Sequence, residues 1–248
     1  MNYLISGGGS GIGRAISIHL AEKGHNCYIL GRNAIKLKET ISLLKEGNHK
    51  YFEADVRNKE ELAAILQKNQ DLVLDGIIAN AGLGGENQFG DDDRWYDIVD
   101  TNLTGTYHTV ESFLPALKKS KNEFKQVLII SSVLARLGVA NYAAYCASKA
   151  GLLGLMRSWA VQYAGDNILV NAICPGWVDT DMAQDGLQGI ADGLGVSKAE
   201  FYKMAMKSVP LGKMSDPEEV AVLVSYLLQQ KSITGQTIDI NNGAIMNS

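Results

Sequence analysis

The chain has 248 residues, of which 46% are hydrophobic and 20% are charged, and its formal net charge is −4. This length and composition are typical of an ordinary globular protein with a single domain. No basic cluster offers nucleic acid an electrostatic footprint, and no uncharged apolar run reaches membrane-spanning length. The three widely spaced cysteines indicate neither a disulfide framework nor a zinc site. Because the first apolar run leaves no room for a signal peptide, a cytoplasmic protein is the default expectation.

Short apolar runs alternate with helix-length amphipathic segments along the whole chain. The apolar runs predict strands over residues 2–6, 26–31, 50–54, 74–82, 126–132, 168–174 and 235–240. The segments between them predict helices over residues 14–24, 34–45, 60–69, 103–118, a stretch that ends near residue 163, and 217–229. This alternation predicts a single-domain α/β protein: a doubly wound Rossmann fold with a seven-stranded parallel sheet flanked by helices. Ligands are then expected at the carboxyl ends of the strands.

The first apolar run leads directly into a glycine cluster, SGGGSGIG, at residues 6–13. It does not match the G-x-G-x-x-G dinucleotide fingerprint, but Gly7, Gly11 and Gly13 follow a related spacing. Glycine permits a tight turn and a close approach to a pyrophosphate, and the following helix offers free N–H groups. A flexible loop is the alternative. The place of the cluster between a strand and an amphipathic helix favours dinucleotide binding by Gly7, Gly9, Ser10, Gly11, Ile12 and Gly13.

The end of the second apolar run bears on the choice of cofactor. An acidic residue there would bind the ribose hydroxyls of NAD, whereas an arginine accommodates the 2′-phosphate of NADP. Here Gly31 holds the usual acid position and Arg32 follows it. NADP is therefore predicted, with NAD as the alternative, because Arg32 could also be a solvated residue that stacks on adenine.

Tyr145 and Lys149 are separated by four positions in AAYCASKAG, residues 143–151, so they would share one helix face. Tyr142 would lie on nearly the same face, seven residues before the lysine, and helical spacing alone leaves two candidate tyrosines. A nearby ammonium favours the phenolate. A phenol whose pKa is brought toward the operating pH can act as an acid in reduction and as a base in oxidation.

These motifs together resemble the short-chain dehydrogenase/reductase family over essentially the whole chain. Residues 6–13 resemble the family's cofactor loop, ADV at 54–56 its adenine contact, and ANAG at 79–82 its NNAG motif with alanine in place of the first asparagine. PGWVDT at 175–180 resembles its nicotinamide-binding turn. The chain is most similar in character to 3-oxoacyl-acyl-carrier-protein reductases, polyketide ketoreductases and related alcohol dehydrogenases.

The resemblance implies hydride transfer between NADP(H) and a ketone or secondary alcohol, with Tyr145 as the acid/base. The family's spacing places the catalytic serine thirteen residues before the tyrosine, which selects Ser132 over Ser131 to polarise the carbonyl. Lys149 would lower the pKa of the tyrosine, and Asn102 would support a water linked to that lysine. The further cofactor contacts that the resemblance implies are Asp55, Val56, Asn80, Ala81, Gly82, Tyr145, Lys149, Pro175, Gly176, Val178 and Thr180.

Structural roles stay open for several of these residues. Ser132 could cap the end of a strand, Asn102 could mark a turn or a helix kink, and Thr180 could cap the next helix. The acids of residues 90–95 fit a solvated helix start. The four histidines are scattered, and no set of His, Asp and Glu has metal-ligand spacing, so no metal is expected.

Residues 181–211 have no strand pattern and resemble the family's substrate lid; a helix packed on the core is the alternative. Ser197 and Glu200 predict a capping box. The helix that follows would place three apolar residues on one face, Phe201, Met204 and Ala205. The pocket under such a lid would be lined by Ser132, Leu134, Tyr142, Tyr145, Trp177 and Met182. No obvious arginine faces it, so a neutral ketone or alcohol is expected.

Other functions of this fold are a non-catalytic nucleotide-sensing regulator and a structural partner of an active homologue, because a fold does not establish a function. The intact set of Asn102, Ser132, Tyr145 and Lys149 favours an enzyme. Within that class, an NAD-dependent secondary alcohol dehydrogenase is the alternative. The resemblance also implies a homotetramer. The ending NNGAIMNS departs from the family's more common aspartate-glycine-glycine pattern.

Overall fold

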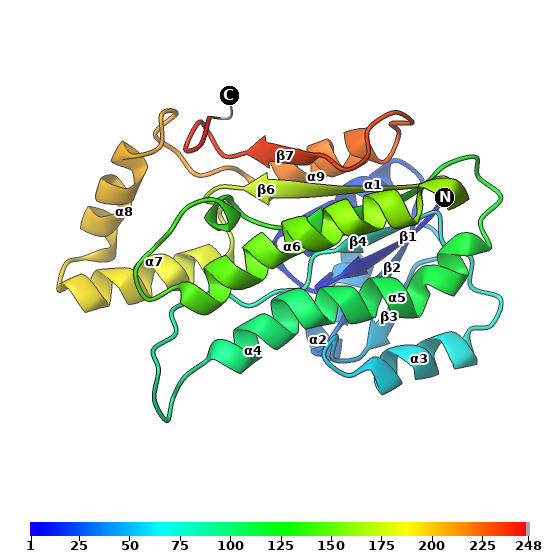
Figure 1. The fold of residues 1–248 in the computed structure, drawn as a ribbon, viewed down its shortest axis with the longest axis horizontal. Coiled ribbons are helices and arrows are strands. Elements are labelled where there is room, and N and C mark those ends of the chain that lie inside the picture. The colour runs from blue at the N-terminus through cyan, green and yellow to red at the C-terminus, as the bar shows by residue number, and fades with distance from the viewer. Residues whose placement is uncertain (247–248) are drawn as a thin grey trace.

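The computed structural model describes residues 1–246, and within them seven strands form one sheet (Figure 1). Every neighbouring pair is parallel, and the order is β3-β2-β1-β4-β5-β6-β7. The strands are β1 (Asn2–Ser6), β2 (Asn26–Gly31), β3 (Lys50–Glu53), β4 (Gly76–Ala79), β5 (Lys125–Ile130), β6 (Ile168–Pro175) and β7 (Thr237–Ile240). The strand order reverses direction between β1 and β4, which is where a doubly wound fold binds its ligand. The predicted fold class is confirmed.

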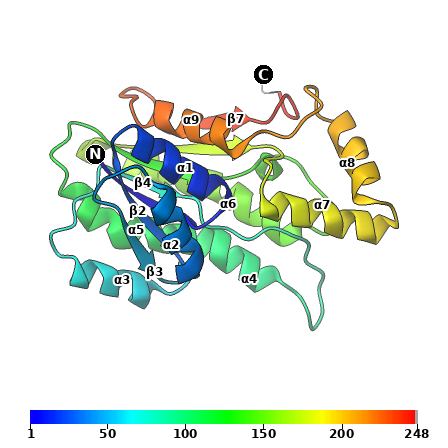
Figure 2. The same cartoon turned by 180° about the vertical axis from the view of Figure 1, so that it is seen from behind.

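Helices cover both faces of the sheet (Figures 1 and 2). On one face lie α3 (Lys59–Lys68), α5 (Gly105–Lys118) and α6 (Ala143–Gln162). The other face is covered by α1 (Gly11–Glu22), α2 (Ala34–Leu43) and α9 (Pro217–Leu227). The last two residues of the chain, at the end of the NNGAIMNS segment, lie outside the described part.

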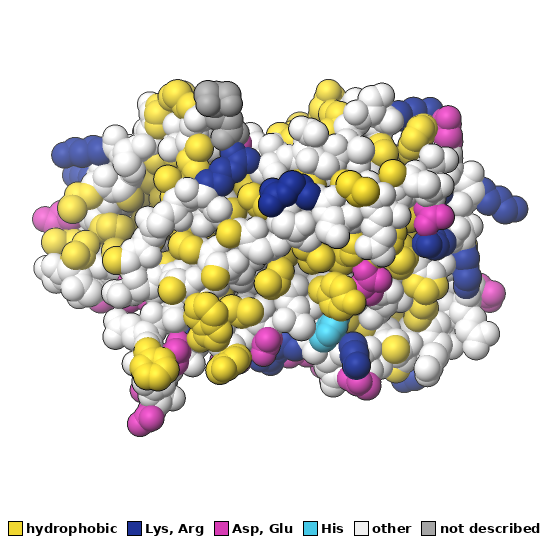
Figure 3. All heavy atoms as spheres, viewed as in Figure 1, with side chains coloured by type: hydrophobic (Ala, Val, Ile, Leu, Met, Phe, Trp, Pro, Cys, Tyr) yellow, Lys and Arg dark blue, Asp and Glu magenta, His cyan; other side chains and the backbone are white. Residues whose placement is uncertain are grey.

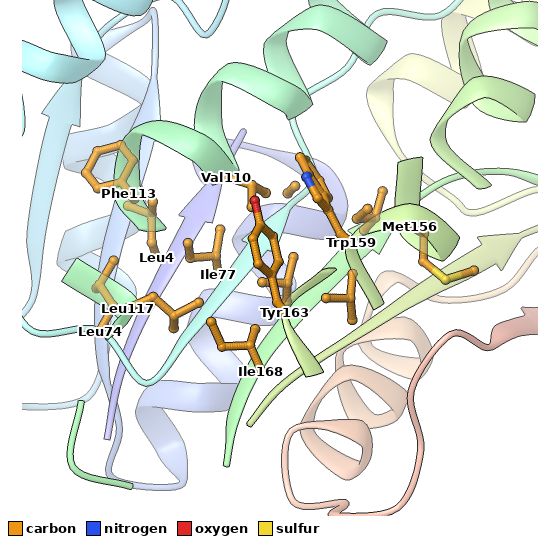
Figure 4. Close-up of a cluster of buried hydrophobic side chains, with 14 of the residues drawn as sticks. Leu4, Leu74, Ile77, Val110, Phe113, Leu117, Met156, Trp159, Tyr163 and Ile168 are labelled. Carbon is orange, nitrogen blue, oxygen red and sulfur yellow. The ribbon is translucent and has the colours of Figure 1, made fainter. Parts of the chain in front are cut away.

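Two hydrophobic cores follow from this layering, because successive strand residues point to opposite faces of a sheet. In β1, Leu4 belongs to the core under α5 and α6, whereas Ile5 belongs to the core under α1 and α9. Figure 4 shows the first core, where Phe113 and Trp159 pack over strand residues. Both cores hold the strand ends rigid, so the loops that leave those ends are placed precisely.

Several helix starts differ from the predicted ones, and α1 begins at Gly11, three residues before the predicted residue 14. The helix predicted from residue 103 begins at Gly105, after a π-helical turn over Asp100–Thr104. Helix α6, which carries Tyr145 and Lys149, begins at Ala143. Tyr142 precedes it as the N-cap residue, with a φ of −113°. Tyr142 therefore lies just before the helix and not within it, although its ring packs edge-on against Tyr145. Apolar spacing detects a helix but not the turn type or the residue at which the chain enters it.

The segment predicted as a lid contains α7 (Asp181–Leu194) and α8 (Lys198–Lys207), which extend beyond one end of the sheet (Figure 1). A small core forms where Leu187, Met206 and Val209 of this segment pack with Met214, which follows it. The predicted capping box of Ser197 and Glu200 is confirmed. Phe201 and Ala205 pack against the small core, but Met204 is 52% exposed, so it does not belong to the buried face.

Candidate active site

A cleft opens at the carboxyl ends of β1, β4 and β5, beside the start of α7. Its lining includes ten predicted cofactor residues and the predicted substrate residue Met182. The ten are Gly7, Ser10, Gly11, Ile12, Asn80, Ala81, Gly82, Tyr145, Lys149 and Thr180. Sequence reasoning missed four further lining residues, Leu83, Ile130, Ser131 and Asp181. The motifs, which are far apart in the chain, thus meet in one place.

The glycine loop fits a bound pyrophosphate. Gly7 and Gly11 have φ values of +67° and +50°, which glycine adopts without strain. A side chain on Gly13 would collide with the carbonyl oxygen of Gly7, so the loop packs too tightly for any larger residue. The N-cap Ser10 makes no side-chain hydrogen bond to the first turn of α1. The N–H groups of that turn are therefore available to an anion at the positive end of the helix.

Ser6, which sequence reasoning missed, fastens the glycine loop to the loop after β4. Its buried hydroxyl accepts hydrogen bonds from the backbone N–H groups of Asn80 and Ala81, both at 3.0 Å. The Asn80 side chain returns a hydrogen bond to the Ser6 carbonyl, also at 3.0 Å. The only sequence feature that indicates these hydrogen bonds is a polar residue at the end of an apolar strand. Asn80 thus supports the shape of the cleft as well as lining it.

The predicted adenine end lies at the tips of β2 and β3. The Arg57 guanidinium binds the Asp55 carboxylate at 2.7 Å, and the half-exposed Arg32 lies 4.0 Å from the same oxygen. Burial raises the pKa of Asp55, but hydrogen bonds from Arg57 and the charges of Arg57 and Arg32 hold it below its usual value overall. Val56 is buried against Gly105 and belongs to the core. This edge therefore carries an available guanidinium and a carboxylate that is already paired.

The structure separates the roles of the two neighbouring serines at the end of β5. The Ser131 hydroxyl donates to the backbone carbonyl of Lys149 at 2.9 Å. The Ser132 side chain is hydrogen-bonded to Tyr145, and its oxygen also accepts from the Leu134 N–H at 3.1 Å. Ser132 thus caps the helical turn of Val133–Ala135, whereas the alternative placed it as the cap of a strand end, and it also faces the tyrosine.

Lys149 is buried beside Tyr145, with its Nζ 5.6 Å from the centroid of the tyrosine ring. The ammonium donates to the carbonyl of Ile130 at 3.0 Å. Burial lowers the pKa of Lys149 to about 8. Burial also raises the pKa of Tyr145, although the hydrogen bond with Ser132 lowers it in part. The pKa of Tyr145 is thus raised overall, whereas the charge of Lys149 alone would lower it. Burial destabilises the phenolate more than the neighbouring groups stabilise it.

Asn102 lies on the π-helical turn and is fully buried. Its side-chain oxygen accepts from the Leu83 N–H at 2.7 Å, and its Nδ2 donates to the Leu83 carbonyl at 3.0 Å and to the Ser148 hydroxyl at 3.1 Å. The Ser148 hydroxyl, which sequence reasoning missed, donates a hydrogen bond to the Tyr145 carbonyl at 2.8 Å. Both amide hydrogens of Asn102 are thus used within the protein, so a water linked to Lys149 would have to bind its oxygen or the main chain.

Only two of the predicted substrate residues, Tyr145 and Met182, line the cleft. The other four, Ser132, Leu134, Tyr142 and Trp177, are not among its lining residues. Tyr142 is buried and packs edge-on against Tyr145, with the ring centroids 6.5 Å apart. Burial and the carboxylate of Glu86 raise the pKa of Tyr142, and the Arg94 guanidinium opposes them. Sequence reasoning missed both of these charged neighbours. Met182 approaches Gly84, where an added side chain would lie 3.1 Å from the methionine.

The turn after β6 leads from the sheet into α7. Gly176 lies close to Asn241, where an added side chain would come within 3.0 Å of the Asn241 backbone. Trp177 packs against the small core of the lid, and Val178 pairs with Ser215. Thr180 caps α7 by accepting from the Ala183 N–H at 3.3 Å, while it also lines the cleft. Both roles that the sequence allowed for Thr180 therefore fit the structure.

No group of three or more His, Cys, Asp or Glu residues within positions 1–246 is placed to hold a metal ion. In the same part of the chain, no helix has the length and apolar character needed to cross a membrane.

Known proteins resemble the chain in both sequence and structure. The family model described as short chain dehydrogenase matches residues 2–190. The 3-oxoacyl-(acyl-carrier-protein) reductase FabG of Rickettsia prowazekii (strain Madrid E) is 33% identical over 248 residues, which cover 98% of this chain and 96% of that protein. FabG of Haemophilus influenzae is 31% identical, with 97% and 96% covered. A variant of actinorhodin polyketide ketoreductase, solved with NADPH, superposes with a TM-score of 0.91 at 30% identity and covers 98% of this chain and 96% of its own.

The chain therefore belongs to the short-chain dehydrogenase family and is an NAD(P)-dependent oxidoreductase. The family resemblance that the sequence motifs predicted is confirmed.

Proposed function

We propose that the protein reduces neutral ketones to secondary alcohols with NADPH, and catalyses the reverse oxidation when the substrates favour it. The observation that carries the proposal is the hydrogen bond between Ser132 and Tyr145, with Lys149 beside the tyrosine ring at the inner end of the glycine-loop cleft. The ketoreductase and FabG relatives support it by analogy.

The nicotinamide ring, when bound, supplies the hydride. Ser132 and Tyr145 together hold the substrate oxygen, and their hydroxyl groups stabilise the charge that develops there. The Tyr145 hydroxyl then gives its proton to this oxygen. Lys149, in its ammonium form, opposes the effect of burial and stabilises the phenolate that results. Gly7, Gly11 and the first turn of α1 would hold the pyrophosphate, and the carboxyl end of β6 would lie along the nicotinamide.

NADP(H) is favoured by the charges at the end of β2. No carboxylate at Gly31 would repel a 2′-phosphate, and the Arg32 side chain is 53% exposed there. The nearby Asp55 is already paired with Arg57, which reduces its repulsion of an anion. The Arg32 guanidinium, which is half-exposed and only distantly paired with Asp55 at 4.0 Å, suits a phosphate better than a pair of ribose hydroxyls.

Arg32→Ala is expected to raise KM for NADPH by roughly ten- to hundredfold, which is the range for losing one hydrogen bond to a charged group. KM for NADH should change less than about threefold, because NADH has no 2′-phosphate for Arg32 to bind. Steady-state kinetics with both cofactors measure this. Lys38→Ala, at an exposed lysine of α2, is the control. An unchanged cofactor preference in Arg32→Ala would contradict the proposed phosphate contact.

A neutral substrate is favoured by the groups at the mouth of the cleft. Tyr142 and Met182 offer apolar surface, while Glu86 and Arg94 beside Tyr142 carry opposite charges. Arg94 is engaged with the Gly84 carbonyl at 3.0 Å, and Arg136 is paired with Asp239 at 2.8 Å. A panel of neutral and anionic ketones, assayed by NADPH oxidation, tests the class. Preferential turnover of the anionic members would overturn it.

We also propose a homotetramer with α5 and α6 at its interface. Tyr107 on α5 is 48% exposed although it stacks on Trp159, and Val161 on α6 is 81% exposed. Such large apolar groups on one face suit a protein contact. Light scattering should give a mass four times that of the chain, and Val161→Glu should lower it. A monomeric mass for the unaltered protein would contradict the proposal.

A further inference from the structure

The helix that carries Tyr145 begins without a cap of its own. Its N-cap residue, Tyr142, makes no side-chain capping hydrogen bond. The N–H groups of the first turn of any helix lack partners within the helix. One of them belongs to Ala144, the residue before Tyr145, and Ala144 is fully buried. A buried N–H group needs an acceptor, which must here come from another part of the chain.

Asn87 supplies that acceptor from the loop of residues 83–94, between β4 and α4 (Trp95–Val99). Its Oδ1 accepts from the Ala144 N–H at 2.8 Å. Its backbone N–H donates to the carbonyl of Asn141 at 2.7 Å. Asn141 has a φ of +63°, a conformation that asparagine tolerates better than most residues. The two hydrogen bonds fasten the loop across the point at which the chain turns into α6.

The amide nitrogen of Asn87 connects the loop to the start of α4 through Asp93. This Nδ2 donates to Oδ1 of Asp93 at 3.2 Å, and the same oxygen accepts from the Trp95 N–H at 2.9 Å. Asn87 and Asp93 therefore form one polar pair that caps two helices. Figure 1 shows the loop projecting outward beyond the start of α4, and Figure 3 shows acidic and apolar side chains together on this projection.

The same loop reaches the cleft at its opposite end. Leu83 lines the cleft and is held by the Asn102 amide through both its N–H and its carbonyl. The loop is thus attached at one end to the floor of the site and at the other end to the first turn of α6. A displacement of the first turn would move Tyr145 relative to Ser132, which follows the end of β5 and caps the turn of Val133–Ala135.

We propose that Asn87 is a positioning residue, which fixes the first turn of α6 and thereby holds the Tyr145 hydroxyl against Ser132 and the substrate oxygen. The inference rests on the proposed acid/base role of Tyr145. Small errors in the position of a reacting group cost rate even when binding is intact. The glycine loop and Arg32, which would hold the pyrophosphate and the 2′-phosphate, lie on other elements, so the loss should fall on kcat more than on KM for NADPH.

The test compares three variants in the NADPH-dependent ketone assay. Asn87→Ala is expected to lower kcat between about tenfold and a hundredfold, with KM for NADPH within about twofold of the unaltered protein. The exchange N87D/D93N keeps an acceptor at position 87 and a donor at position 93, so it should restore kcat to within about threefold. Asp216→Ala removes a cap of the same kind from α9, where Asp216 accepts from the Glu218 N–H at 2.9 Å. It should lower Tm and leave kcat unchanged.

The proposal is overturned if Asn87→Ala retains its kcat, if the exchange folds but stays as slow as the alanine variant, or if Asp216→Ala loses as much kcat as Asn87→Ala. If Asn87→Ala does not fold, Asn87→Ser replaces it, since serine is too short to reach Ala144, and the same difference from the exchange is expected. Tyr145→Phe distinguishes failure of the positioning role of Asn87 from failure of the proposed acid/base mechanism. An inactive Tyr145→Phe with a fully active Asn87→Ala removes only the positioning role, whereas an active Tyr145→Phe removes the proposed mechanism itself.

Discussion

Tyr145→Phe is expected to lower kcat for ketone reduction by about 10²- to 10⁴-fold, the usual contribution of a positioned general acid. Phenylalanine keeps the ring that packs edge-on against Tyr142 and removes only the hydroxyl that is hydrogen-bonded to Ser132. The half-buried ring has the same shape in both proteins, so the fold and the cofactor cleft should be preserved. Steady-state kinetics, with NADPH binding followed by fluorescence, measure the two effects separately.

Two further tyrosine variants identify the residue responsible. Tyr142→Phe should change KM for the ketone more than kcat, because Tyr142 lies beside the cleft as a wall. Tyr226→Phe, at an exposed position of α9, is the matched control and should leave both constants unchanged. If Tyr142→Phe were inactive and Tyr145→Phe active, the assignment of the acid would be reversed.

Lys149→Met is expected to lower kcat by roughly 10²- to 10³-fold, comparable to the loss of one donor that stabilises developing charge. Methionine keeps the unbranched apolar stem and removes the buried ammonium. Without the ammonium, burial alone would set the pKa of Tyr145, and the phenolate would lose the cation 5.6 Å from the ring centroid. Lys149→Met that turned over as fast as the unaltered protein would exclude this electrostatic role.

The same substitution should alter stability in a pH-dependent way. The folded pKa of Lys149 is about 8, below the usual 10.5, so the folded protein binds this proton less tightly than the unfolded chain. Below pH 8 the buried ammonium therefore costs stability, and the cost fades as the pH rises from 8 to 10.5. The advantage of Lys149→Met over the unaltered protein should shrink by about 2 kcal/mol between pH 7 and pH 9.5.

Denaturant unfolding of the cofactor-free protein at the two pH values measures this change. The hydrogen bond to the Ile130 carbonyl is stronger from the ammonium than from the neutral amine, and this difference is already contained in the folded pKa of Lys149. Lys121→Met, at an exposed lysine, is the control and should show no such trend. A constant difference across the pH range would show that Lys149 titrates normally in the folded protein.

Much of the fold and of the cleft could be predicted because short-range patterns determine them. Alternating apolar runs and amphipathic segments define the strand and helix layers, and glycine spacing marks the turn between β1 and α1. The order of the motifs along the chain then placed Tyr145, Lys149 and the glycine loop at one edge of the sheet. Tertiary structure brought them together as expected, since all of them follow strand ends.

The remaining features depend on contacts between distant segments, which carry no local signal. Ser6, Asn87 and Ser148 are single polar residues whose partners lie 46 to 75 positions away or on another element. The π-helical turn around Asn102 has the same apolar spacing as an α-helix. The pKa of Tyr145 depends on how deeply the folded chain buries it, which outweighs the charge of a lysine four residues away.

The most direct test of the proposed function is transfer of the hydride itself. NADPH carrying deuterium at both C4 positions is incubated with the protein and a neutral ketone, and the product is examined by mass spectrometry. The proposed function predicts a secondary alcohol with one deuterium on the carbinol carbon, formed by the unaltered protein and about 10²-fold or more slowly by Tyr145→Phe. Absence of deuterium transfer to every ketone in the panel, or equal transfer by Tyr145→Phe, would contradict it.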